Sequence, residues 1–150
     1  MITVRYREIE GDLFAEKRDC YFAHCISADF ALGAGIARKF NSLYNMRAKL
    51  IEWLDVPWRE VKIGSAILID GVFNLVTKPR YFNKPTYSSL QLALLDMREQ
   101  CVSLGIERLV MPRIGCGLDR LDWDTVRDLI KRVFRDTDVE ITVYYLKEKE

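Results

Sequence analysis

The sequence lacks the patterns that mark a metal site, a disulfide framework or a membrane protein. It holds one histidine and four cysteines, and no two cysteines form a CxxC pair. A zinc site is therefore not expected. No apolar run approaches the roughly 20 residues of a membrane span, and no apolar signal core follows Met1. We expect reduced, mostly buried thiols in a cytoplasmic protein, or a nuclear one if the source is eukaryotic, with no membrane partner.

The charge is almost balanced. Lysine and arginine number 23 against 22 acidic residues, which leaves a net charge of +1. This argues against a protein that coats nucleic acid, although a local basic groove stays compatible with it. About half of the 150 residues are hydrophobic, enough for one domain, residues 1–150, with its own core. We expect a monomer.

Hydrophobic periodicity predicts strands mixed with helices. Strands are predicted at residues 2–9, 20–26, 65–69, 72–77, 108–111 and 141–146, and helices at 36–40, 46–54, 87–104 and 123–134. This order predicts an α/β fold with a mixed sheet of about six strands and helices on both faces. Ligands of such sheets bind at loops beyond the strand ends, here residues 27–35, 77–85 and 113–119.

Two of these loops are rich in glycine. Gly33-Ala34-Gly35-Ile36 feeds a predicted helix, where backbone amides and the helix dipole favour an anion, although an ordinary turn has the same pattern. Residues 114–119, Ile-Gly-Cys-Gly-Leu-Asp, could form an amide nest for a diphosphate. The Gly-Lys-Ser/Thr ending of a P-loop is missing, which argues against nucleoside triphosphate hydrolysis. Cys116 would act as a nucleophile only if His24 met it, and a packed thiol is favoured.

Single residues near these loops have two interpretations each. Lys78, at a strand end, is by default a solvated cation, but beside a pocket it could attack an electrophilic carbon, and Lys84 is an equally basic competitor. Asp12 either caps a turn or accepts a hydrogen bond from an amino group of a base. Trp53 and Trp58 lie near several basic residues, and we interpret them as core or lid rather than as a base-stacking surface.

Taken together, these stretches resemble the macrodomain family. The similarity is to the terminal ADP-ribose protein glycohydrolase branch, and also to the macrodomain of DNA ADP-ribosyl glycohydrolase antitoxins. It covers about residues 8–146 and is weak over residues 41–62. The stretches that carry it are Gly11–Phe14, Ala23–Ser27, Gly33–Ala37, Thr77-Lys78, Lys84–Tyr87, Met111–Leu121, Thr142–Tyr144 and Leu146.

The resemblance implies an enzyme that uses Lys78 and Asp119. The lysine would attack the anomeric carbon of the distal ribose, and the aspartate would act as the acid/base that resolves the lysyl intermediate. It also implies ADP-ribose contacts at Asp12, Leu13, Ser27, Gly33, Ala34, Gly35, Ile36, Thr77, Pro112, Arg113, Ile114, Gly115, Cys116, Gly117, Leu118 and Leu146. The family needs neither a metal nor a cofactor.

Two departures bear on the activity. The Asn-Ala-Ala motif of other hydrolytic macrodomains is absent, so their water-activating mechanism is not carried over, and Pro79 stands where a second basic residue is frequent. We predict a hydrolase that removes mono-ADP-ribose from acidic side chains of proteins. The alternatives are a hydrolase of ADP-ribosylated DNA, with a link to DNA damage, and a reader that binds ADP-ribose without turnover. A reader needs the glycine loops but not Lys78 with Asp119.

Overall fold

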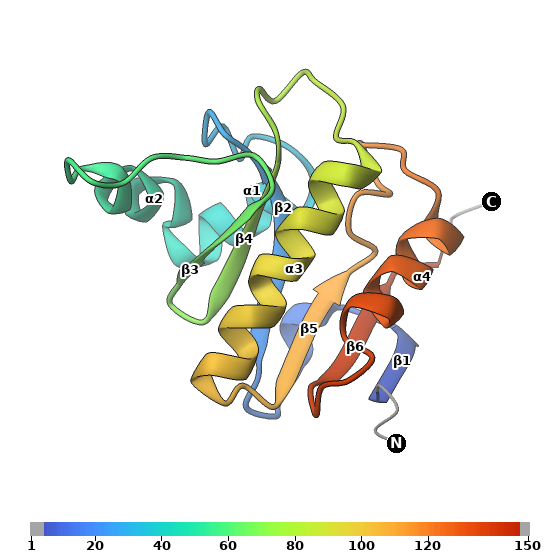
Figure 1. Cartoon of the computed structure of the whole chain (residues 1–150). Helices are drawn as coiled ribbons and strands as arrows, with labels where there is room; N and C mark the ends of the chain where they lie inside the picture. Colours follow the sequence, from blue (N-terminus) through green and yellow to red (C-terminus); the bar gives the residue numbers. More distant parts are fainter. Residues whose placement is uncertain (1–4, 148–150) are drawn as a thin grey trace.

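Six strands form one sheet in the computed structural model, which describes residues 5–147 (Figure 1). The strands are β1 (Arg5–Glu10), β2 (Tyr21–Ser27), β3 (Ser65–Ile69), β4 (Val72–Lys78), β5 (Arg108–Pro112) and β6 (Glu140–Tyr145). Their order is β1-β6-β5-β2-β4-β3, with β3 antiparallel to β4 and the other neighbours parallel. The predicted mixed sheet is confirmed. Residues 2–4 of the first predicted strand lie outside the described residues.

The central strands are apolar because helices cover both faces of the sheet. Six of the seven residues of β4 are buried, which is typical of a strand packed on two sides. The turn between β3 and β4 has positive φ at Asp70 (49°) and Gly71 (77°). This is the conformation that a two-residue hairpin turn requires, and it joins the two strands predicted at residues 65–69 and 72–77.

Two layers of helices enclose the sheet. The first layer holds the short 3₁₀ helix η1 (Leu13–Ala15), α1 (Gly35–Tyr44) and α2 (Met46–Leu54), and the second holds α3 (Tyr87–Leu104) and α4 (Trp123–Val133) (Figure 1). Each layer has its own core. Phe40, Met46 and Leu50 are fully buried in the first core, and Leu94 and Ile130 in the second.

Local capping fixes the ends of the second-layer helices. Thr86 and Ser89 form a reciprocal capping box at the start of α3, and Gly105 ends the helix in the left-handed conformation, with φ of 68°. Asp122 accepts a hydrogen bond from the amide of Thr125 at 3.0 Å and so caps α4. These caps give α3 the bounds predicted from the sequence.

The parallel arrangement decides where a site can form. The carboxyl ends of β1, β2, β4, β5 and β6 meet at one edge of the sheet, so the loops that follow them lie side by side. Among residues 5–147, no helix combines the length and the apolar character that crossing a membrane requires.

Candidate functional site

A cavity of about 1430 Å³ opens at the carboxyl edge of the sheet. Its wall contains most of the residues predicted from the sequence to form the site: Asp12, Leu13, Ser27, Gly33, Ala34, Gly35, Ile36, Lys78, Pro112, Arg113, Ile114, Gly115, Cys116, Gly117, Leu118, Asp119 and Leu146. The three loops predicted to lie beyond the strand ends therefore share one cavity. That these residues contact a ligand stays a prediction.

Lys78 and Asp119 place an amine and a carboxylate in contact in the wall of this cavity. The Nζ atom of Lys78 lies 2.6 Å from Oδ1 of Asp119, and the two side chains are 14% and 16% exposed. Lys78 ends β4, and Asp119 follows β5 with the end of β2 between them. An amine and a carboxylate within hydrogen-bond distance can pass a proton between them and leave the amine free to attack. Lys84 is exposed and forms no ion pair with any residue in 5–147. Of these two lysines, Lys78 is therefore the one that has a carboxylate partner.

The loop between β2 and α1 brings a helix N-terminus to the cavity. Ala34 occupies the N-cap position and α1 begins at Gly35, with no side chain bonding to the first amides. Gly35 adopts φ of +60°, a backbone conformation that favours glycine. Free amides and the helix dipole together make this end of α1 suited to an anion.

The loop between β5 and α4 supplies a second set of amides. Gly115 has φ of +73°, a backbone conformation that favours glycine, and a Cβ atom there would lie 2.9 Å from the end of the Leu121 side chain, which would have to shift. At Gly117 a Cβ atom would meet nothing within 4 Å. The loop therefore packs tightly at Gly115 and leaves open space at Gly117, next to the cavity.

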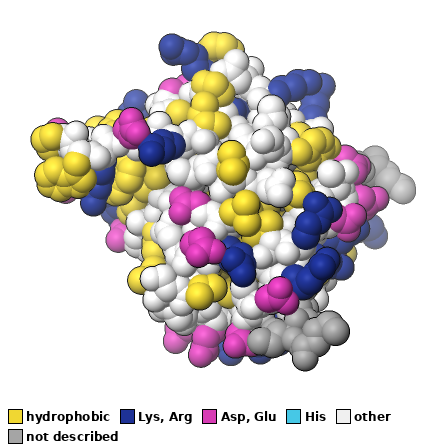
Figure 2. All heavy atoms as spheres, viewed as in Figure 1, with side chains coloured by type: hydrophobic (Ala, Val, Ile, Leu, Met, Phe, Trp, Pro, Cys, Tyr) yellow, Lys and Arg dark blue, Asp and Glu magenta, His cyan; other side chains and the backbone are white. Residues whose placement is uncertain are grey.

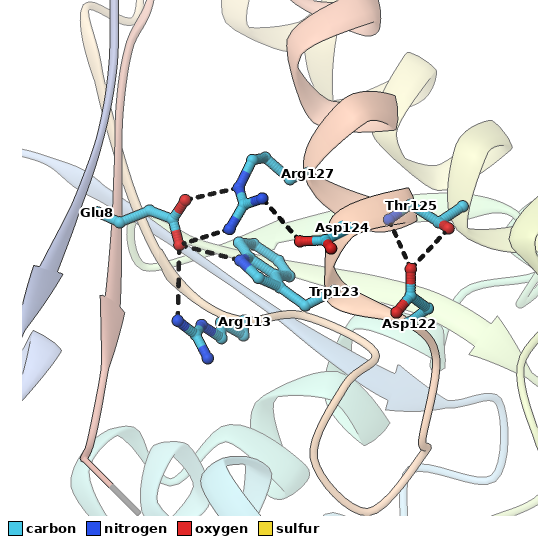
Figure 3. Close-up of polar contacts among 7 residues, drawn as sticks. All are labelled: Glu8, Arg113, Asp122, Trp123, Asp124, Thr125 and Arg127. Atoms are coloured by element: carbon cyan, nitrogen blue, oxygen red, sulfur yellow. Dashed lines mark hydrogen bonds and ion pairs between the residues drawn. The ribbon is translucent and has the colours of Figure 1, made fainter.

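Arg113 is held at the cavity wall by a network that the sequence did not predict (Figure 3). Its guanidinium lies 4.4 Å from the ring centroid of Tyr145, 5.7 Å from that of Trp123 and 3.8 Å from a carboxylate oxygen of Glu8. Glu8 also accepts hydrogen bonds from Trp123 Nε1 at 2.9 Å and from Arg127 at 2.7 Å. Because the residues of this network, Arg113 included, come from four separate segments, sequence spacing carries no signal for the network.

The charge of Glu8 is stabilised by this network. Burial alone would raise the pKa of Glu8, but the hydrogen bonds from Arg127 and Trp123 and the positive charges of Arg127 and Arg113 hold that pKa below its ordinary value. Glu8 therefore keeps the negative charge that orients Arg113 toward the cavity.

The part of the cavity that follows β1 is formed around η1. The side chain of Asp12 accepts a hydrogen bond from the amide of Phe14 at 3.0 Å and so caps η1, and its other oxygen lies 3.8 Å from Lys39. The Asp12 side chain is still 52% exposed, which leaves it accessible to a ligand. Leu13 is buried below it, and Leu146 is 76% exposed at the rim. Asp12 thus performs the turn-capping role, and its predicted ligand role is compatible with that.

The thiols and the histidine of this region are poor nucleophiles in this setting. Burial raises the pKa of Cys116 to about 11, and burial with the Asp119 charge raises that of Cys25 to about 12. His24 is fully buried, hydrogen-bonded to Asn74 at 2.6 Å, and stacks on Phe40. Cys116 therefore lacks a histidine base, in agreement with the packed-thiol interpretation.

Three sequence expectations need correction. Thr77 does not line the cavity and is 2% exposed, and it lies at the irregularity in register where β4 pairs with the end of β2. Trp58 is neither core nor lid, since it is 78% exposed on the loop before β3, whereas Trp53 is half-buried against the first core. Of the four thiols, which are all free, only that of Cys101 is buried, and the others are half-buried.

Further residues line the cavity without having been predicted as contacts. They are Gly11, Phe14, Cys25, Ile26, Ala31, Leu32, Ala37, Lys39, Tyr81, Phe82, Asn83, Lys84, Arg120, Leu121, Asp122, Trp123, Tyr144 and Tyr145. Six of them, Ala31, Leu32 and Tyr81–Lys84, lie inside the predicted loops 27–35 and 77–85, and the others lie within four residues of a predicted site residue. Within residues 5–147, no three His, Cys, Asp or Glu side chains gather as ligands of a metal ion would.

The sequence of this chain is similar to that of curated proteins, and its fold is similar to that of solved structures. No family model matches the chain. The chain is 42% identical over 146 residues to human "ADP-ribose glycohydrolase OARD1", an alignment that covers 95% of this chain and 92% of the human protein. Among solved structures, the macrodomain of Mycobacterium tuberculosis DarG superimposes with a TM-score of 0.81 at 21% identity, over 94% of this chain and 97% of that one.

A third comparison comes from a structure with a bound ligand. Thermosipho africanus DarTG, solved in complex with ADP-ribose, matches with a TM-score of 0.77 at 19% identity and covers 97% of this chain and 43% of that one. At this level of identity the likeness establishes the fold, which is that of a macrodomain.

Proposed function

Because this chain belongs to the ADP-ribose glycohydrolase family and has the macrodomain fold, we propose that it binds ADP-ribose and hydrolyses the ester bond between mono-ADP-ribose and acidic side chains of proteins. The observation that carries the proposal is the contact of 2.6 Å between Lys78 Nζ and Asp119 Oδ1 in the wall of the cavity. The reaction proceeds through a covalent adduct on Lys78.

The first step transfers the ribose from the carboxylate to the lysine. Nζ of Lys78 attacks the anomeric carbon of the distal ribose, and a carbon–nitrogen bond forms as the bond to the ester oxygen breaks. The electron pair of that bond leaves with the carboxylate of the protein substrate. Asp119 accepts the proton that the nitrogen releases, since its oxygen lies within direct hydrogen-bond reach.

The second step restores the lysine. Asp119 returns its proton to the nitrogen, the carbon–nitrogen bond breaks, and water adds to the anomeric carbon while its proton passes to Asp119. The products are ADP-ribose and the free Lys78 amine, and Asp119 passes the proton taken from water to solvent, which restores its carboxylate. Each proton thus moves through the same carboxylate, which explains why a single acidic residue beside the lysine is sufficient.

The rest of the cavity supports binding of the nucleotide part. The uncapped start of α1 and the amides around Gly117 suit a diphosphate, which carries negative charge without needing a metal. Arg113 adds a positive charge that Glu8 holds in place. After β1, the exposed carboxylate of Asp12 can accept a hydrogen bond from the amino group of adenine.

The alternative functions differ from this proposal in what they require. A reader would need the glycine loops alone, and it would have no use for the Lys78–Asp119 pair. A hydrolase of ADP-ribosylated DNA would use the same pair on another leaving group. We favour the protein substrate because the chain has a net charge of only +1.

Release of ADP-ribose from two substrates tests the proposal. The wild-type protein is incubated with a glutamate-modified protein and with an ADP-ribosylated DNA oligonucleotide, and free ADP-ribose is quantified. We expect faster release from the protein, with an unmodified glutamate as the second product. Release from the oligonucleotide alone would favour the DNA substrate. Binding of ADP-ribose with release from neither substrate would favour the reader.

A further inference from the structure

Two exposed aromatic side chains stand at the mouth of the cavity, on the loop that begins directly after Lys78. Tyr81 and Phe82 are 66% and 67% exposed and belong to the cavity lining. Their ring centroids lie 5.3 Å apart with an interplanar angle of 89°. Figure 2 shows hydrophobic side chains beside lysine or arginine over this loop, which is at the top of Figure 1. Exposed aromatic pairs are costly in water and often mark a contact surface.

The backbone below these rings is fixed. The amide of Tyr81 donates to Oδ2 of Asp29 at 3.0 Å, and Asp29 also accepts a hydrogen bond from the amide of Ala31 at 3.1 Å. Arg80 and Asn83 hold the turn by two further hydrogen bonds of 3.0 Å. The rings are therefore presented by a pre-organised loop, which lowers the entropy lost when a partner binds.

The charge of Asp29 strengthens this attachment. Burial would raise the pKa of Asp29, but hydrogen bonds from the Ser27 hydroxyl and from the amides of Tyr81 and Ala31 hold it below its ordinary value. A charged acceptor makes stronger hydrogen bonds than a neutral one. Asp29 thus joins two of the three loops of the cavity.

The loop is also positively charged. Arg80 and Lys84 are exposed, neither forms an ion pair with any residue in 5–147, and residues 79–86 contain no acidic side chain. An anionic partner would therefore be attracted to this side of the cavity mouth.

We propose that Tyr81 and Phe82 form a subsite for the leaving group and bind the polypeptide segment next to the modified acidic side chain. The inference rests on the proposed function. Once ADP-ribose fills the cavity and its anomeric carbon meets Lys78, the attached group must lie at the mouth, beside this loop. Tyr81 and Phe82 are then specificity-determining residues, and Arg80 and Lys84 favour segments with further acidic residues.

The shape of the pair favours a peptide over nucleic acid. Stacking of a base uses the open face of an aromatic ring. Tyr81 and Phe82 are nearly perpendicular, so they offer a corner in which one apolar side chain can pack against a face and an edge.

A comparison of substrates with small and large leaving groups tests the subsite. The double variant Tyr81→Ala/Phe82→Ala is compared with wild type on an ADP-ribosylated acidic peptide, on an ADP-ribosylated oligonucleotide and on an ADP-ribosyl ester of acetate. Trp58→Ala is the matched control, because Trp58 is also an exposed aromatic side chain but lies outside the cavity. Calorimetry with free ADP-ribose reports whether each variant still folds and binds.

The ratio of kcat/KM for the peptide to kcat/KM for the acetate ester decides the question. We expect this ratio to fall roughly 10-fold in the double variant, as loss of two aromatic contacts implies, and to stay unchanged in Trp58→Ala. An unchanged ratio in the double variant would overturn the subsite. A fall confined to the oligonucleotide would overturn its assignment to a peptide. If wild type hydrolyses neither ester, the proposed function itself fails, which is a separate result.

Discussion

Lys78 and Asp119 lie 41 residues apart in the sequence, yet their side chains meet at 2.6 Å over the end of β2. The sheet order produces this contact, because β4 and β5 flank β2 and all three strands are parallel. Lys78 is the last residue of β4, and Asp119 lies on the loop after β5. The reacting pair is thus built by the topology of the sheet.

Removal of Asp119 should leave the nucleophile but block the proton transfers. In Asp119→Ala we expect turnover to fall by about 10²–10⁴-fold, the range for loss of a general acid/base. Because the adduct is no longer resolved, intact-mass spectrometry should detect ADP-ribose bound to Lys78. Asp136→Ala, at an exposed position beyond α4, should behave as wild type. Wild-type turnover in Asp119→Ala would contradict the assignment.

Two glycines of one loop should respond differently to substitution. Gly117→Val should reduce ADP-ribose affinity by roughly 10-fold or more without unfolding, because its side chain enters open space beside the cavity. Gly115→Ala should instead lower the free energy of unfolding by about 1–3 kcal/mol, because its Cβ would lie 2.9 Å from Leu121 at a positive φ. Calorimetry and chemical denaturation separate the two effects. Equal affinity of wild type and Gly117→Val would remove this loop from the binding site.

The Glu8 network should make stability depend on pH at acidic values. The pKa of Glu8 is lowered from 4.5 in the folded chain, so its charge stabilises the fold above that pH, and the contribution is lost as the pH falls through the lowered pKa. Glu8→Gln should cost about 1–2 kcal/mol at pH 7 and weaken ADP-ribose binding through Arg113. The difference between wild type and Glu8→Gln in denaturation should shrink below pH 4.5. Glu60→Gln, which changes an exposed ion pair, is the control and should show neither effect.

His24 should destabilise the fold as the pH falls below neutral. Burial lowers its pKa from 6.5 to about 4, so between these values the unfolded chain binds a proton that the folded chain does not. Stability should therefore decrease from pH 6.5 toward pH 4, by about 3 kcal/mol at most. In His24→Gln this component should be absent, since His24 is the only histidine. Denaturation curves of both proteins that shift in parallel over this range would refute the buried neutral histidine.

Local signals predicted most of the fold. The helix α3 has the predicted bounds because Thr86 and Gly105 cap it through contacts within a few residues. The hairpin at Asp70-Gly71 is equally local. Such features depend on neighbouring residues alone, so their pattern is visible in the sequence. The predicted monomeric state and cytoplasmic location stay predictions.

Features of the site that depend on tertiary contacts could not be predicted from residue patterns. The sequence could not separate Lys78 from Lys84, because both are basic residues near one strand end. The hydrogen bond from the Tyr81 amide to Asp29 joins loops 52 residues apart, and no spacing rule predicts it. The burial of Thr77 is a further example, because it lies at the irregular end of the pairing between β4 and β2.

Turnover and ligand binding by Lys78→Ala test the central claim most directly. The variant is compared with wild type and with Lys62→Ala, a change at an exposed lysine outside the cavity, on a glutamate-modified protein and in calorimetry with ADP-ribose. The account predicts that Lys78→Ala releases no ADP-ribose above background but binds it with an affinity within about one order of magnitude of wild type, while Lys62→Ala matches wild type in both. Undiminished release by Lys78→Ala would contradict the nucleophilic lysine.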